Sequence, residues 1–248
     1  MPKTLARIVA VAVVLGFPAT MLTPTAYAQD PSCTPEVVSA SSGPFPMVLP
    51  IKTTQTLTYT VTLSNSCGAT GRLHIHSGYD PDSEPLVDEL SLVSAEDGLE
   101  TFAASRSIDS TGLSTAYAGL WETRLVGRGL DTEGPPAQLV WEVRLNTHAT
   151  PEPVDKGDKI TITGKVRIGS WDLNRNLRAV QAPIRLQFRT PDGNYRTIKR
   201  VTSGDRGDPK TTVTANRDGC FRFVFDPWSP DEDRWIKTRS RGDCVDVR

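Results

Sequence analysis

Alternation of apolar and polar residues is the feature that most constrains how this chain can fold. Between residues 56 and 63, apolar residues occupy every second position and threonines the positions between them. A period of two places one set of side chains on each face of a β-strand. The pattern returns at residues 139–145, 184–188 and 221–225, and no stretch of helical length carries a 3.6-residue apolar stripe. We therefore predict an all-β chain.

Turn signals and one proline-rich segment indicate how the strands are grouped. Short strands separated by turns favour sandwiches over parallel sheets. The turn at residues 191–194, Pro-Asp-Gly-Asn, predicts a hairpin. Residues 149–158 contain two prolines and a glycine, and are typical of a semi-rigid linker. We predict two tandem β-sandwich domains, at residues 29–148 and 159–248.

The first 28 residues have the form of a cleavable export signal. Lys3 and Arg7 precede an apolar run at residues 8–15, and Ala26 and Ala28 are the small residues that a signal peptidase reads. The run is too short to span a bilayer, which needs about 20 apolar residues. We expect a secreted protein that starts at Gln29 and has no membrane span.

The charge balance argues against a nucleic-acid partner. The chain has 28 basic and 29 acidic residues, and its formal net charge is −1. Nucleic-acid-binding proteins usually present a strongly basic face. Here the two signs are interspersed, and only short basic clusters such as Arg196, Lys199 and Arg200 occur.

Four cysteines in an exported chain predict two disulfides, since the compartment is oxidising. Cys33 and Cys67 lie in the first half, and Cys220 and Cys244 lie near the C-terminus. Three pairings are possible, and one local bridge in each half is the simplest. The spacing of the four cysteines does not suit a metal site.

Several residues invite a metal-site hypothesis that the pattern does not support. His74 and His76 point to one face of a strand, but a zinc site needs three or four protein ligands, and His148 lies next to the linker. The acidic segments at residues 78–84 and 231–233 do not fit an EF-hand. We expect no metal and no cofactor.

Trp228 and Trp235 are the candidate ligand platform, because they flank an acidic loop at residues 229–233. Exposed indoles beside carboxylates suit a sugar ring, whereas buried ones would only cap the core. The two Arg-Gly-Asp tripeptides, at residues 206–208 and 241–243, are interpreted as turns rather than adhesion motifs.

The sequence carries no recognised catalytic motif. The chain has no Gly-x-Ser-x-Gly elbow, no His-Glu-x-x-His and no phosphate-cradling glycine loop. We predict a non-enzymatic binding or structural module of the cell envelope or the extracellular space, whose partner is an unknown protein or glycan. The alternatives are an envelope-polymer hydrolase with its site at the domain junction, and an extracellular protease inhibitor or glycan-binding module.

The second half resembles a family of secreted, largely uncharacterised actinobacterial proteins. The segments that carry the resemblance are residues 151–166, Trp171-Asp172 and residues 180–189, 195–199, 218–222 and 245–247. The resemblance implies an immunoglobulin-like or prealbumin-like sandwich and no catalytic residues. Aromatic residues are typical of that family where this chain has Cys220 and Cys244, and the paired departure favours a bridge between them. Residues 118–121 and 129–131 are similar to the late-strand pattern of bacterial immunoglobulin-like modules.

Overall fold

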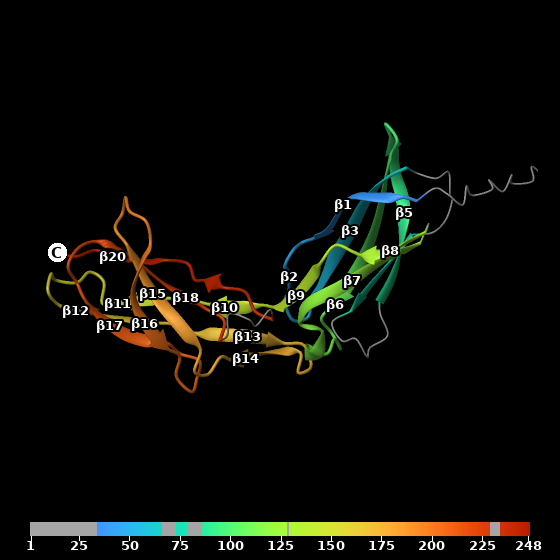
Figure 1. Ribbon diagram of the computed structural model, residues 1–248. Helices are drawn as coiled ribbons and strands as arrows, with labels where there is room; N and C mark the ends of the chain where they lie inside the picture. Colours follow the sequence, from blue (N-terminus) through green and yellow to red (C-terminus); the bar gives the residue numbers. More distant parts are fainter. Residues whose placement is uncertain (1–33, 66–72, 79–85, 128, 229–233) are drawn as a thin grey trace, which may run out of the picture.

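The computed structural model describes residues 34–65, 73–78, 86–127, 129–228 and 234–248 (Figure 1). The described chain is built almost wholly from β-strands, with one short 3-10 helix, η1 (Thr115–Tyr117). The predicted all-β fold is therefore confirmed. None of the helical structure in the described ranges has the length and apolar character needed to cross a membrane. The predicted leader, residues 1–28, lies outside the described residues.

The N-terminal half forms one sheet of nine strands. Its strands are β1 (Glu36–Gly43), β2 (Met47–Leu49), β3 (Thr54–Ser64), β4 (Leu73–Gly78), β5 (Leu86–Glu96), β6 (Leu99–Asp109), β7 (Gly119–Gly127), β8 (Leu130–Glu133) and β9 (Ala137–Trp141). They follow the order β1-β3-β6-β5-β4-β7-β9-β2, with β8 paired to β7. β1 is antiparallel to β3, and β2 is parallel to β9. β5 connects the two ends of this order, because its first residues pair with β4 and its later residues pair with β6.

The alternation in the sequence produces the first core directly. In β3, Leu57, Tyr59, Val61 and Leu63 are buried, whereas the threonines between them are half-buried. Burying one face of a strand removes apolar surface from water, which is the main favourable contribution to folding. The buried face packs with Trp121 of β7 and other apolar residues of the same core. The predicted strand at residues 56–63 is confirmed.

The C-terminal half has three smaller sheets around a second core. Its strands are β10 (Val143–Leu145), β11 (His148–Thr150), β12 (Lys159–Thr163), β13 (Val166–Ser170), β14 (Arg175–Arg178), β15 (Pro183–Arg189), β16 (Arg196–Thr202), β17 (Lys210–Thr214), β18 (Gly219–Phe225), β19 (Thr238–Arg239) and β20 (Asp243–Val245). The sheets are β10-β13-β14, β11-β12-β17 and β16-β15-β18-β19, with β20 paired to β18. β15 and β16 are antiparallel neighbours, as the turn at residues 191–194 predicts.

One alternating segment is shared between the two halves. Residues 139–145 read as a single strand, but the structure divides them at Glu142 into β9 and β10. β9 pairs with β7 and β2 in the first sheet, whereas β10 pairs with β13 in the second half. The chain therefore passes from one core to the other before the predicted linker. Within that linker, Ala149 and Val154 are buried in the second core, and the division into two domains stays a prediction.

Trp171 joins the two halves. It follows β13 but is buried in the first core, and its indole Nε1 donates a hydrogen bond of 3.0 Å to the Leu49 carbonyl oxygen of β2. Asp172 accepts hydrogen bonds from the backbone N–H and the hydroxyl of Thr115. In Figure 1 the end of β13, which these residues follow in the chain, lies where the two lobes of the ribbon meet. Side-chain packing and hydrogen bonds therefore both hold the junction.

Candidate functional site

Trp228 and Trp235, the predicted ligand platform, belong to a row of aromatic rings. Their ring centroids are 5.0 Å apart with the planes tilted by 56°, and Trp141 lies 5.2 Å beyond Trp235. Trp228 is 39% exposed, but Trp235 is half-buried and packs against the second core. The pair therefore presents one exposed ring rather than two on a flat surface.

The other candidate residues lie apart from one another. His74 is half-buried in β4, and among the described residues no three His, Cys, Asp or Glu side chains lie close enough to hold a metal ion. His148 lies 3.3 Å from Asp243 through its Nδ1 atom. Gly207, in the middle of the first Arg-Gly-Asp tripeptide, is buried in a turn. Residues 80–84 and 231–233, as well as Cys33 and Cys67, lie outside the described residues.

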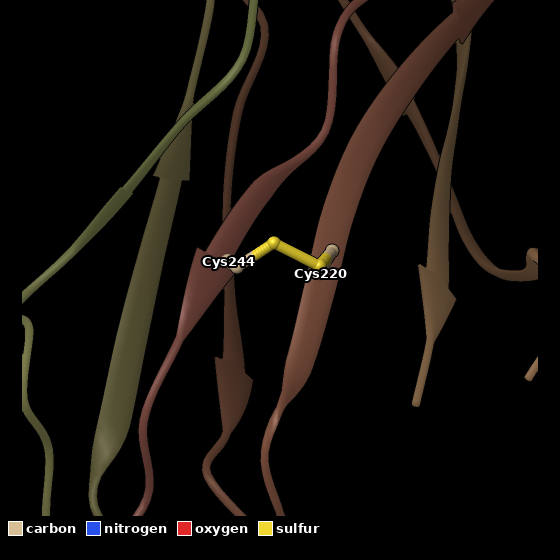
Figure 2. The surroundings of a disulfide bond; sticks show 2 residues. All are labelled: Cys220 and Cys244. Atoms are coloured by element: carbon tan, nitrogen blue, oxygen red, sulfur yellow. A yellow bond between two sulfur atoms is a disulfide. The ribbon is translucent and has the colours of Figure 1, made fainter. Parts of the chain in front are cut away.

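Cys220 and Cys244 form a disulfide, as predicted (Figure 2). The two cysteines lie directly opposite each other on the antiparallel strands β18 and β20. The bond attaches the C-terminal strand β20 to the central strand of its sheet. Next to it, Gly242 leaves room for Tyr195, since a Cβ atom there would lie 2.1 Å from the Tyr195 hydroxyl oxygen.

The outward face of the same sheet carries a cluster of arginines. On β15 and β18 the inward positions are apolar, whereas Arg185, Arg189 and Arg222 occupy alternate outward positions. Strand register places Arg200 of β16 opposite Arg185, and places Val224 between Arg185 and Arg239 of β19. We call the surface formed by Arg185, Arg189, Arg200, Arg222, Arg239 and Tyr195 the arginine face.

Most of the charge on the arginine face has no internal counter-charge. Asp226 pairs with Arg185, at 2.7 Å to its Nη2 atom, and lies 3.7 Å from Lys237. Within the described part of the chain, Arg189, Arg222 and Arg239 have no acidic partner. The Arg189 Nε atom is buried there and makes no hydrogen bond. The charges of Arg239 and Arg189 both act unfavourably on the charged form of Arg222, and a bound anion would offset this repulsion.

Tyr195 organises two of these arginines. The Arg222 guanidinium carbon lies 3.8 Å from the centroid of the Tyr195 ring, and that of Arg189 lies 5.2 Å from it. Arg222 also donates a hydrogen bond of 2.8 Å to the Gln187 side chain. Burial lowers the pKa of Arg222, and the charges of Arg239 and Arg189 lower it further, while Tyr195 opposes the shift. Arginine nevertheless remains protonated in proteins, so Arg222 is held as a preoriented cation.

Preoriented guanidinium groups bind carboxylate, phosphate or sulfate groups through paired N–H donors. In this face Arg222 is held by the Tyr195 ring and by its hydrogen bond to Gln187 before any ligand arrives. Preorganisation of this kind reduces the entropy lost on binding. The arrangement is therefore suited to binding anions.

Sequence reasoning did not identify the arginine face, although a signal for it was present. Alternation correctly placed the phenylalanines of residues 221–225 inward, and Arg222 therefore outward. The arginines come from β15, β16, β18 and β19, which are separated by up to 54 positions in the sequence, from Arg185 to Arg239. Only the strand order brings them together, and the near-neutral net charge conceals the cluster.

No protein-family model matches the chain, and no curated protein matches its sequence. Solved structures with similar shape include dimeric latent PorU from Porphyromonas gingivalis, at 13% identity and a TM-score of 0.32, covering 90% of this chain and 21% of that one. A putative membrane anchored protein from Corynebacterium diphtheriae has 11% identity and a TM-score of 0.31, covering 84% and 53%. The I9–I11 tandem from titin has 11% identity and a TM-score of 0.28, covering 87% and 66%. At these sequence identities and TM-scores we draw no inference about function from the three structures.

Proposed function

We propose that this chain is an exported, non-enzymatic binding module that acts at or outside the cell envelope, and that its arginine face holds a negatively charged partner. The observation that supports this proposal is the set of three arginines without an acidic partner in the described residues, two of which share the Tyr195 ring. A rigid sheet that presents fixed cations supports binding rather than turnover. Export is supported by the form of residues 1–28 and by the Cys220–Cys244 disulfide.

The packing of the junction also favours a binding role. The alternative of a hydrolase places its site between the two halves, where Trp141 and Trp171 pack edge to face with centroids 6.1 Å apart. Trp235 also packs against Trp141, with ring centroids 5.2 Å apart. We therefore expect no turnover of proteolytic, esterase or glycosidase substrates by the purified chain. A measurable rate that one substitution abolishes would contradict a non-enzymatic role.

Cosedimentation with insoluble envelope material from the producing cells tests the binding role. The test variant is R189Q/R222Q/R239Q. The matched control is R175Q/R178Q/R217Q, which removes the same charge from exposed arginines elsewhere in the C-terminal half. We expect the wild type and the control to sediment and to be released by high salt, since salt screens exposed charges. The test variant should stay in the supernatant, and equal sedimentation of both variants would contradict the proposal.

A further inference from the structure

The geometry of the arginine face identifies a class of partner, and this inference rests on the proposed function. We propose that the partner is a linear anionic polysaccharide that lies diagonally across β15, β18 and β19. Each sugar unit with a carboxylate, or with an equivalent phosphate or sulfate group, would meet one arginine.

The three arginines without an acidic partner in the described residues form a diagonal line. Arg189 on β15 lies opposite Cys220, two positions before Arg222 on β18. Arg239 on β19 lies opposite Val224, two positions after Arg222. Diagonal neighbours on adjacent strands are about 7–8 Å apart, so the line extends over about 15 Å. A single small anion cannot contact both ends of such a line, whereas a chain with repeated negative charges can.

Neutral polar groups accompany the charges. Gln187 and Thr197 face each other in the same cross-strand row as Arg222, and their side chains are linked by a hydrogen bond of 3.3 Å. An amide and a hydroxyl both donate and accept hydrogen bonds. They therefore suit the hydroxyl groups of a sugar ring next to its acidic group.

The face lacks the features that a polypeptide partner needs. β18 already has strands on both sides, so an added peptide strand would find no free backbone groups there. Protein interfaces obtain much of their energy from apolar and aromatic anchors. Here the outward-facing Val224 is only 1% exposed, and Arg222 lies over the Tyr195 ring. Charge complementarity and hydrogen bonds to hydroxyls are what this surface offers.

Titration calorimetry of the full mature chain tests the inference. The probes are polygalacturonate as a carboxylated polysaccharide, galacturonate monomer, poly-Glu as an acidic polypeptide, a single-stranded DNA oligonucleotide and neutral dextran. We expect polygalacturonate to bind at least about tenfold more tightly than the monomer, because several linked charges meet several arginines. It should also bind at least about tenfold more tightly than poly-Glu, which has no hydroxyl groups for Gln187 and Thr197. Neutral dextran should not bind, and added salt should weaken the binding of polygalacturonate.

Variants assign the binding to the arginine face. R189Q/R222Q/R239Q should lose about tenfold or more in affinity for polygalacturonate, and R175Q/R178Q/R217Q should stay within about twofold of the wild type. The single variant R239Q should fold normally, since Arg239 is exposed. Its loss of affinity for polygalacturonate should be smaller than that of the triple variant.

The possible outcomes separate the two proposals. If poly-Glu or DNA binds more tightly than polygalacturonate and depends on the same arginines, the proposal of a polysaccharide partner is wrong. The proposed binding of a negatively charged partner is then still supported. If the monomer binds as tightly as the polymer, the linear arrangement is wrong. If both triple variants bind polygalacturonate like the wild type, the arginine face is not the site, and both proposals fail.

Discussion

At the scale of single residues, Trp171 shows how one side chain can tie together parts of the chain that are far apart in sequence. It is 1% exposed, its ring contacts Trp141, and its N–H satisfies the Leu49 carbonyl oxygen 122 positions away. Both kinds of contact are lost if the side chain is shortened. A large buried aromatic residue with a satisfied polar atom is among the most sensitive positions in a protein.

W171A should therefore destabilise the chain strongly. Loss of the buried ring is expected to lower the free energy of unfolding by about 3–5 kcal/mol. W171F should cost roughly 1–3 kcal/mol, because it retains apolar volume but leaves the buried Leu49 oxygen without its donor. Urea denaturation measures both, with W228A as the control, since Trp228 is partly exposed. If W171A cost no more than W228A, Trp171 would not stabilise the junction.

Asp172 gives the junction a dependence on pH. Hydrogen bonds from the hydroxyl and the backbone N–H of Thr115 lower the pKa of Asp172 in the folded chain. Its contribution to stability is therefore complete above the pKa of an unfolded aspartate, about 3.9. It is lost as the pH falls through the lower pKa of the folded state.

D172N tests this dependence. The stability lead of the wild type over D172N should be constant at neutral pH and should shrink as the pH falls below about 4. Denaturation series at several pH values measure it. A lead that grows toward acid pH would mean that the carboxylate is not stabilised at this position.

At the scale of single elements, the sequence predicts strands well where one face is buried. The alternation at residues 56–63 becomes β3, and the turn at residues 191–194 joins β15 to β16. It does not predict that Glu142 divides residues 139–145, because the alternation continues unbroken across the change of sheet. Nor does it predict the arginine face, since strand neighbours are not encoded locally. Periodicity specifies which face of a strand is buried, but not which strands lie beside it.

The disulfide between β18 and β20 should stabilise the C-terminal edge of its sheet. The cysteines are 24 positions apart, and closing a loop of this length contributes about 3.5 kcal/mol through the unfolded chain. C220S/C244S should unfold at a correspondingly lower temperature or urea concentration. Because the double serine variant leaves Cys33 and Cys67 untouched, it isolates this bond where a reductant would not. Unchanged stability would mean that β20 is held by its backbone pairing alone.

At the scale of the whole molecule, the two cores are linked more closely than two domains on a flexible linker would be. β10 and β11, together with Val154, belong to the second core although they precede residue 159. Trp171 belongs to the first core although it follows that residue. We therefore expect an autonomous C-terminal unit to begin near residue 143.

Two fragments test this boundary. Residues 143–248 should give a cooperative unfolding transition, because all strands of the second core are present. Residues 159–248 lack β10 and β11, and should be markedly less stable or unfolded. Thermal unfolding followed by circular dichroism compares the stability of the two fragments. Equal stability of the two fragments would place the boundary at the predicted linker.

The central claim is that the arginine face, rather than the tryptophan pair, is where this molecule binds its partner. A single NMR titration with a short galacturonate oligomer distinguishes the two sites. Arginine Nε–H and indole Nε1–H signals can both be followed in proton–nitrogen correlation spectra. We predict that the signals of Arg189, Arg222 and Arg239 shift in parallel as the oligomer is added and reach a plateau at saturation. The signals of Trp228 and Trp235 should not shift. Shifts confined to the two indole signals would contradict the account and would assign binding to the aromatic pair.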